Sequence, residues 1–375
     1  MDFFSSKKSD LFLVLITLGL VTFGTAMIYS SSFIIASTMK NDGYYFLKRQ
    51  LGFFAVGIAL MYLFSRIHYE TLRKFAYPAL GLAVVLLIAL MIPGVGVRKN
   101  GATRWINLGL FAFQVAEFAK VAVILFLAHY LSKYEKDIRD MKQGFLIPLG
   151  VAGVVMLLII KQPDFGTMVL IAMLLVSMMC LAGTRVLHLS ALIALSIPVG
   201  IYMVISHPYR VKRFLSFLNP WENARDSGFQ IIQSWLSFGS GGPFGVGLGD
   251  GMQKLFYLPE PHTDFILSVV AEETGFIGVA AVISLFCLFV IKGFLIAFKK
   301  QDTFGTLLAS GLTMLIGFEA VINIAVVVGL IPTKGLALPF MSYGGSSLVM
   351  SMICVGILLN ISTSGSARAM RRVRN

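Results

Sequence analysis

Ten apolar stretches run through this 375-residue sequence and determine the solvent in which it can fold. Most of them approach the roughly 20 residues that an α-helix needs to cross a bilayer. A chain with 57% hydrophobic residues, 13% charged residues and a mean hydropathy of +0.84 cannot hide its apolar surface from water. We therefore expect an all-α integral membrane protein, one polytopic domain over residues 1–375 with about ten transmembrane helices. The expected spans are 11–28, 51–64, 77–92, 115–131, 145–160, 167–182, 187–205, 276–296, 306–328 and 346–361.

An even number of spans places both chain ends on one side of the membrane, and the distribution of Lys and Arg indicates which side. More than half of the 31 Lys and Arg residues fall in segments that share a side with the termini, so we expect cytoplasmic N- and C-termini. Because further spans follow the first, we expect it to be retained rather than cleaved as a signal peptide. The outer segments still carry many cations, which indicates an anionic ligand on that side.

The largest outer segment, residues 206–275, lies between the seventh and eighth spans and begins HPYRVKRFLSFLNPW. Arg210, Lys212 and Arg213 make this start basic and amphipathic. A helix lying at the interface with its cations on lipid phosphates explains the pattern as well as ligand binding does. The cations flank membrane spans and accompany no nucleic-acid-binding motif, so a nucleic-acid partner is not expected.

The same segment contains a glycine-rich run, FGSGGPFGVGLGDGMQKLFYLPEPHTD, over residues 238–264. Irregular backbone beside membrane helices is found where protein or a water-filled cavity satisfies its polar groups, so the run predicts a cavity or a re-entrant segment. A flexible outer loop is the alternative. The run ends in His262, Thr263 and Asp264. Glu272 and Glu273 follow Asp264 by eight and nine residues. Thr263 or Asp264 is a good helix N-cap, which competes with a chemical role for the Asp264 carboxylate.

Polar residues within the spans are expensive in hydrocarbon and are usually paired or functional. Glu117 and Lys120 are three residues apart on one helix face, so they can form either a structural ion pair or a substrate contact. Asp164 interrupts an apolar run and is expected to cap or line a break. Glu319 and Asn323 share a face, which favours hydrogen bonds between helices. The three cysteines lie at unrelated spacings and suggest neither a disulfide framework nor a metal cluster.

The last outer turn, GLIPTKGLALPFMSYGGSS at residues 329–347, is also unusual. Lys334, Ser342 and the backbone N–H groups at the start of the following helix are able to bind an oxyanion. A simple capped helix start explains the same residues.

Four of these motifs together resemble the SEDS family of bacterial cell-wall polymerases, and they are more similar to its division members than to its elongation members. RWINLGLFAFQVAEFAK and KQPDFGT extend the resemblance upstream, so that it covers nearly the whole chain in order. Val115 stands where the family usually has proline, and Thr274 where it usually has leucine. The four motifs are HPYRVKRFLSFLNPW, SFGSGGPFGVGLGDGMQKLFYLPEPHTDFI, AEETGFIG and GLIPTKGLALPFMSYGGSS.

The resemblance implies a peptidoglycan glycosyltransferase that polymerises lipid II on the outer face of the bacterial cytoplasmic membrane, at the division septum. The family's essential aspartate matches Asp264, its charged pair matches Glu117 and Lys120, and its signature lysine matches Lys334. Implied partners are lipid II, a single-span class B penicillin-binding transpeptidase and other division proteins.

In this reaction we expect Asp264 to act as the general base while the anomeric centre is inverted and undecaprenyl pyrophosphate leaves. The expected cations for the pyrophosphate are Arg210, Arg213, Lys120 and Lys334, and Glu117, His262 and Ser342 complete the expected substrate-binding set. No spacing marks a metal site. A divalent cation, Mg²⁺ or Mn²⁺, is compatible with oxygens from Asp264, Glu272 and Glu273, or with recruitment by the pyrophosphate itself.

Two other functions fit a ten-span chain: a lipid II flippase, or a non-catalytic division scaffold. A flippase needs a polar route through the membrane midplane, whereas the unusual polar segments gather on the outer side. Glu117, Lys120 and Glu319 are the deeper exceptions. For a scaffold, Asp264 would be a plain helix cap.

Overall fold

The computed structural model describes residues 10–99, 102–107, 109, 111–206, 208–224, 228–254, 258–333 and 335–373. Within these residues, ten helical segments are long and apolar enough to cross a membrane, which confirms the predicted number. The ten segments are α1 (Leu11–Lys40), α2 (Tyr45–Arg66), the run of α3 (Tyr69–Leu72), η1 (Arg73–Phe75) and α4 (Ala76–Ala89), then α5 (Val115–Lys133), η3 (Lys142–Leu146) with α6 (Ile147–Lys161), α7 (Phe165–Ala182), α8 (Val186–Ile205), α11 (Ile266–Phe298), α12 (Thr303–Val328) and α13 (Gly345–Val373). A short 3₁₀ turn, η2 (Glu135–Asp137), follows α5.

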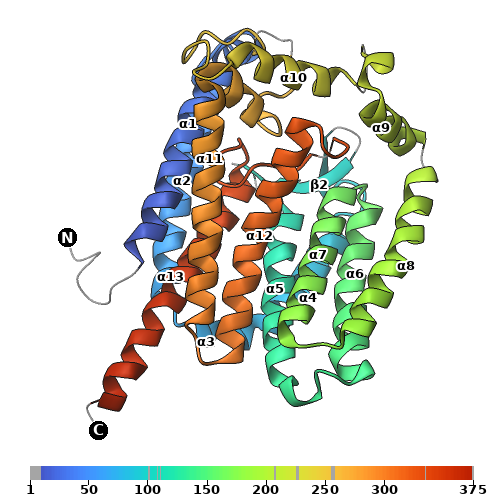
Figure 1. The fold of residues 1–375 in the computed structure, drawn as a ribbon, viewed down its shortest axis with the longest axis vertical. Coiled ribbons are helices and arrows are strands. Elements are labelled where there is room, and N and C mark those ends of the chain that lie inside the picture. Colours follow the sequence, from blue (N-terminus) through green and yellow to red (C-terminus); the bar gives the residue numbers. More distant parts are fainter. Residues whose placement is uncertain are drawn as a thin grey trace.

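The helices form one bundle with α5 and α12 at its centre (Figure 1). In the most apolar windows of α5 and α12, 72% of the residues are buried, against 6% in α8. Helix α8 stands at the edge of the bundle, where lipid can cover its apolar side chains (Figure 1). Because lipid is as apolar as leucine, such a helix needs little packing against its neighbours to remain in the membrane.

Polar side chains and glycines set several helix ends. Asp10 caps α1, Asp164 caps α7 and Asp302 caps α12, each by accepting a backbone N–H three residues on. Gly183 and Gly329 end α7 and α12 in the left-handed conformation. The expectation that Asp164 caps a break is confirmed, since its Oδ1 accepts from Thr167 N at 3.1 Å.

The segment between α8 and α11 contains helices as well as irregular backbone. It contains α9 (Pro208–Leu218), η4 (Pro220–Asn223) and α10 (Phe229–Gly241), and α9 and α10 lie across the end of the bundle opposite the C-terminus of α13 (Figure 1). Helix α11 begins at Ile266 rather than at the predicted residue 276, and it is broken at Gly275, where φ is 67° and ψ is −164°. The predicted boundary therefore coincides with the break, and not with the start of the helix.

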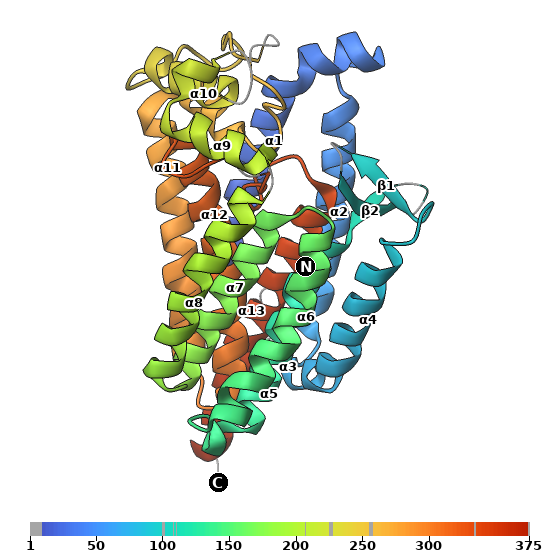
Figure 2. The ribbon, with the colours of Figure 1, turned by 90° about the vertical axis from the view of Figure 1, so that its right-hand side faces the viewer.

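A small antiparallel sheet was not predicted. Its order is β1 (Gly96–Lys99), β2 (Ala102–Asn107) and β3 (Ala112–Gln114), and it lies beside the outer ends of α2 and α4 (Figure 2). Strand β2 carries the first four residues of the RWINLG motif, whose alternation of polar and apolar residues is too brief to stand out in an apolar chain. The sheet holds Arg104 at the end of the bundle where α9 lies.

Candidate functional site

Asp264 sits where the glycine-rich segment meets α11, and it does not cap that helix. The N-cap of α11 is Phe265, with no side-chain cap hydrogen bond, and the Thr263 hydroxyl donates instead to Glu260 O at 3.0 Å. Within the described part of the chain, the half-buried Asp264 carboxylate accepts no hydrogen bond and forms no ion pair. The alternative in which Asp264 caps α11 is therefore wrong.

Asn323 fixes the backbone around this carboxylate. Its Nδ2 donates to Asp264 O at 2.8 Å and to Leu336 O at 2.7 Å, so one amide on α12 joins the start of α11 to the last outer turn. At Gly335 a Cβ atom would lie 3.1 Å from Asp264 Oδ2, so the last outer turn packs directly against the carboxylate. The predicted hydrogen bonding between helices is made by Glu319, which binds Lys120 of α5, whereas Asn323 binds backbone just before α11 and in the turn before α13.

Ser342 and His262 strengthen the same junction. The Ser342 hydroxyl donates to Thr263 O at 2.6 Å and accepts from Leu338 N at 2.8 Å. Tyr343 N donates to His262 O at 2.8 Å. Both hydrogen bonds of the Ser342 hydroxyl are therefore made within the protein. This favours a role in positioning the backbone at Thr263 over direct contact with a substrate. The His262 ring is buried against Phe46, with centroids 4.4 Å apart, and burial lowers its pKa to about 4, so His262 is neutral at physiological pH.

Arg104 and Arg213 act electrostatically on the Asp264 carboxylate. Together with Arg210, which lies on the same helix as Arg213, they are here called the basic rim. Arg213, on α9, donates to Thr333 O at 3.2 Å, and Arg104 donates to Gln162 O at 3.3 Å. Arg104 Nε also lies 3.7 Å from an Asp164 carboxylate oxygen.

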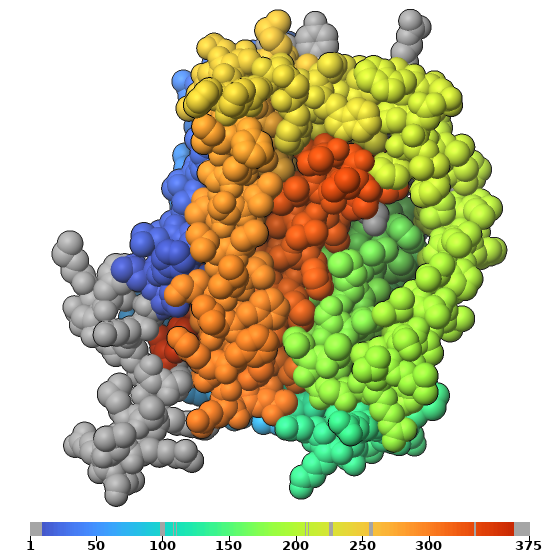
Figure 3. Space-filling view, in the orientation of Figure 1, coloured from blue at the N-terminus to red at the C-terminus, as the bar shows by residue number. Residues whose placement is uncertain are grey.

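Arg210 lies three residues before Arg213 on α9. Its guanidinium lies over the Phe165 ring at 5.5 Å and donates to Met203 O at 2.8 Å. The space-filling view shows this face hollowed beneath α9, between α8 and the body of the bundle (Figure 3).

The electrostatics of Asp264 combine opposing effects. Burial, with a smaller contribution from the Glu260 carboxylate, raises the pKa of Asp264 to about 7, although Arg213 and Arg104 act to lower it. A carboxyl group poised near neutrality can both accept and release a proton at physiological pH.

Glu117 and Lys120 form the predicted ion pair, and the structure adds a third member. Lys120 Nζ lies 2.9 Å from Glu117 Oε1 and also binds Glu319 across the bundle. All three side chains are buried. Glu319 precedes Asn323 by four residues on α12, which is about 6 Å of helix, so this buried triad lies roughly one turn deeper than Asp264. Lys120 therefore contacts two carboxylates, and this arrangement favours helix packing over pyrophosphate binding.

Glu272 and Glu273 do not join Asp264. Their carboxylates accept hydrogen bonds from backbone N–H groups of the glycine-rich segment, among them Met252 N at 2.8 Å and Gly249 N at 3.1 Å. In the described residues, no three His, Cys, Asp or Glu side chains converge as metal ligands would. The residues present thus do not fit a resident divalent cation with Asp264, Glu272 and Glu273 as its ligands.

Lys334 lies outside the described residues, between Thr333 and Gly335, which both border the site. Arg104 and Glu260 were not among the predicted site residues. Each is a single charge in a turn or short strand. Glu260 is only four residues from Asp264 in the chain, whereas the fold brings Arg104 to the site. The resemblance signalled Arg104, because RWINLG belongs to its motifs, but nothing in the residue spacing singled it out.

Comparison with known proteins agrees with this architecture. The family model for FtsW, RodA and SpoVE, described as "Cell cycle protein", matches residues 10–367. The chain belongs to this family. This membership confirms the resemblance seen in the motifs. A relative in Geobacter sulfurreducens, "Probable peptidoglycan glycosyltransferase FtsW", is 45% identical over 95% of this chain and 96% of its own. "Stage V sporulation protein E" of Bacillus subtilis is 43% identical over 96% and 98%.

Two solved structures share the fold. One, described as "Structural coordination of polymerization and crosslinking by a peptidoglycan synthase complex", superposes with a TM-score of 0.78 at 29% identity, covering 94% of this chain and 97% of that one. The rod shape determining protein RodA of Thermus thermophilus superposes with a TM-score of 0.67 at 26% identity, covering 93% and 95%. The chain is thus a multi-pass membrane protein that covers nearly the whole length of these relatives.

Proposed function

We propose that this protein is a peptidoglycan glycosyltransferase that polymerises lipid II on the outer face of the bacterial cytoplasmic membrane during septal cell-wall synthesis. The names of its relatives support the reaction class. The observation that carries the proposal is the half-buried Asp264 carboxylate, which has no direct partner among the described residues and lies beside a basic rim. This combination suits an acceptor hydroxyl next to an anionic leaving group.

In the proposed mechanism, the GlcNAc 4-hydroxyl of one lipid II attacks the anomeric carbon of the MurNAc at the end of the growing strand. Asp264 accepts the hydroxyl proton as the new C–O bond forms. The bond from the anomeric carbon to the pyrophosphate oxygen breaks, its electron pair leaves with undecaprenyl pyrophosphate, and the centre inverts. General-base catalysis of this kind contributes roughly 10²- to 10⁴-fold in rate.

The basic rim is suited to the leaving group. Arg213 and Arg104 act on the Asp264 carboxylate across the site, so a pyrophosphate bound between them would receive charge-assisted hydrogen bonds in a site of low dielectric. Arg210 extends the rim toward α8 and the surrounding lipid, and Lys334 belongs to the turn that packs against Asp264. We assign Glu117 and Lys120 to holding the spans in register, because their charges already pair with each other and with Glu319.

A class B penicillin-binding transpeptidase is the partner that we propose. The structural neighbour is described as a synthase complex that coordinates polymerisation and crosslinking, which supports such an assembly in general terms. A septal location and cytoplasmic termini are part of the same proposal.

The direct test is polymerisation of lipid II by the purified protein in detergent, together with its transpeptidase partner. We expect glycan strands to form, and one molecule of free undecaprenyl pyrophosphate to be released for each glycosidic bond made. No polymer, combined with movement of lipid II between leaflets when the protein is placed in liposomes, would instead establish a transporter.

The outward orientation is tested by thiol labelling in a variant that lacks Cys180, Cys287 and Cys354. A cysteine at Leu248, which is 70% exposed, should react with a membrane-impermeant reagent added from outside the cytoplasmic membrane. A cysteine at the exposed Lys136 should not react. The reverse pattern would place Asp264 on the cytoplasmic side and contradict the proposal.

A further inference from the structure

A second group of buried polar side chains surrounds the break in α11 at Gly275. The break leaves N–H and C=O groups on both sides without helical partners, and residues 242–254, here called the glycine-rich loop, supply four hydrogen bonds to them. These bonds are Val246 N to Glu272 O (2.9 Å), Gly247 N to Glu273 O (3.2 Å), Phe276 N to Gly242 O (2.9 Å) and Ile277 N to Pro243 O (3.2 Å). The loop thus completes a helix that is interrupted.

Side chains would prevent this contact. A Cβ atom at Gly245 would lie 2.2 Å from Glu273 O, and one at Gly275 would lie 2.3 Å from Gly245 N. Both glycines also have positive φ values, 82° and 67°, which other residues adopt with strain. Two backbones are therefore in direct contact, and the flexible-loop alternative does not describe this part of the segment.

The Glu272 and Glu273 side chains hold the rest of the loop. Glu272 accepts from Met252 N at 2.8 Å and from Gln253 N at 3.2 Å, and Glu273 accepts from Gly249 N at 3.1 Å. Both side chains are buried, with relative exposures of 2% and 1%. Each carboxylate is thus directed at the loop.

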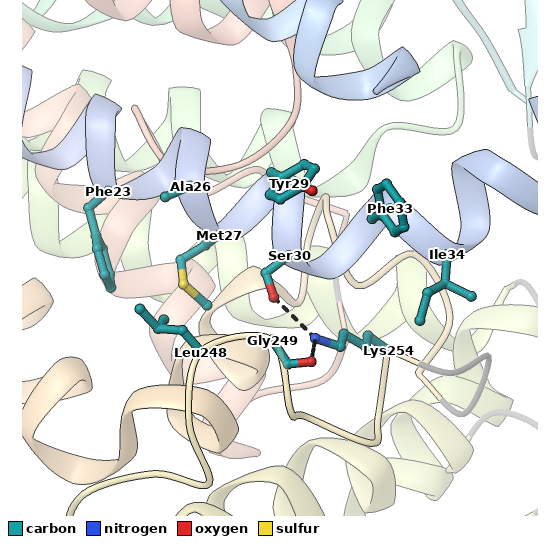
Figure 4. A pocket seen from close by; sticks show the side chains of 10 residues that line it. All are labelled: Phe23, Ala26, Met27, Tyr29, Ser30, Phe33, Ile34, Leu248, Gly249 and Lys254. Carbon is teal, nitrogen blue, oxygen red and sulfur yellow. Dashed lines mark hydrogen bonds between the residues drawn. The ribbon is translucent and has the colours of Figure 1, made fainter. Parts of the chain in front are cut away.

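Lys254 completes the arrangement and links it to α1. Its ammonium donates to Glu273 Oε1 at 2.8 Å, to Ser30 Oγ at 3.2 Å and to Gly249 O, and the Ser30 hydroxyl donates to Glu273 at 2.6 Å. Ser30, Gly249 and Lys254 contribute polar groups to the lining of a largely apolar groove of about 440 Å³ between α1 and the loop (Figure 4). The ammonium therefore uses all three of its N–H donors within the protein.

We infer that Glu272 and Glu273 are positioning residues for the reaction at Asp264. They fix the loop whose continuation carries Glu260, His262 and Asp264 into the site. Buried charges are a costly way to hold a loop, since apolar residues of similar size often give equal stability. Carboxylates that accept several directed hydrogen bonds instead determine the register of the loop, and a misplacement of about 1 Å can cost on the order of 10²-fold in rate. The inference rests on the proposed glycosyltransferase function.

The test compares Glu272→Gln and Glu273→Gln with Glu222→Gln, which removes an exposed carboxylate from the same outer segment. A glutamine brings an amide N–H₂ toward N–H donors, so we expect faster hydrogen exchange at the amides of Gly249, Met252 and Gln253. For lipid II polymerisation per folded molecule, we expect kcat to fall roughly 10- to 100-fold with KM nearly unchanged. Glu222→Gln should match the wild type in both measurements.

A double variant tests the ion pair between Lys254 and Glu273. Lys254→Met with Glu273→Gln in one chain should recover part of the kcat that Glu273→Gln alone loses, because no unpaired ammonium remains. Faster loop exchange with an unchanged kcat would overturn the positioning role, and unchanged exchange would overturn the anchoring itself. A wild-type protein that forms no polymer would refute the proposed function and the positioning role with it, whereas the exchange data would still report on the anchors.

Discussion

Asp264, just before α11, and the buried triad about one helical turn deeper both combine carboxylates with cations, but they satisfy their charges in different ways. In the triad, Lys120 directly contacts Glu117 and Glu319, and all three side chains are buried. At Asp264 the arginines act through space, while the described residues give the carboxylate no hydrogen bond. A charge whose partners are all within the protein has little left to offer a substrate. A carboxylate without a hydrogen-bond partner in the described part of the chain retains that capacity.

We expect the largest effect on activity from Asp264→Asn. The amide has nearly the size of the carboxylate but cannot take up a proton. We expect lipid II polymerisation to fall by about 10²- to 10⁴-fold. Burial disfavours the ionised carboxylate, so thermal stability above pH 7 should be equal to or higher than that of the wild type. Polymerisation assays and thermal unfolding on the same preparations measure both effects, and an active Asn variant would assign the base to another residue.

Lys120→Met tests the buried triad. It leaves Glu117 and Glu319 buried without their cation, and we expect a loss of about 3–5 kcal/mol in the free energy of unfolding. The triple variant Glu117→Gln, Lys120→Met, Glu319→Gln contains no buried charge in this cluster and should be more stable than Lys120→Met alone. Denaturation in a mild detergent tests this order. Losses that simply add across the three sites would show that the side chains do not interact.

Smaller effects are expected from the groups that surround Asp264. Arg213→Gln removes a cation that favours the carboxylate, so it should raise the pKa of Asp264 and move the acid limb of kcat/KM to higher pH. Glu260→Gln removes a like charge and should move the limb to lower pH. The two pH–rate profiles check these opposite signs. Shifts in the same direction would mean that the limb does not report Asp264.

The amino-acid sequence predicted the membrane fold well because hydrophobic length is a local property. The ten spans, the Glu117–Lys120 pair and the cap at Asp164 all depend on neighbours in the chain. The β1–β2–β3 sheet was missed, because its strands are short and its pairing joins residues that carry no strong pattern.

The site was only partly predictable for a related reason. Asp264 was identified from the family motifs, but residue spacing could not separate a helix cap from a catalytic carboxylate. The structure excludes the cap, because Phe265 takes the cap position and Asn323 holds the Asp264 backbone from another helix. The catalytic role belongs to the proposed function. Glu319 likewise became the third member of the triad only when α5 and α12 packed together.

The central claim is that Asp264 accepts the proton of the attacking hydroxyl, and the pH dependence of lipid II polymerisation by the wild-type protein tests it most directly. Because the carboxylate must be ionised to act as a base, and because burial raises its pKa to about 7, kcat/KM should rise with pH through a midpoint near 7. The protein should remain folded across that range, as circular dichroism can verify. A rate that is constant from acid to neutral pH, or that falls as pH rises through about 7, would contradict the account.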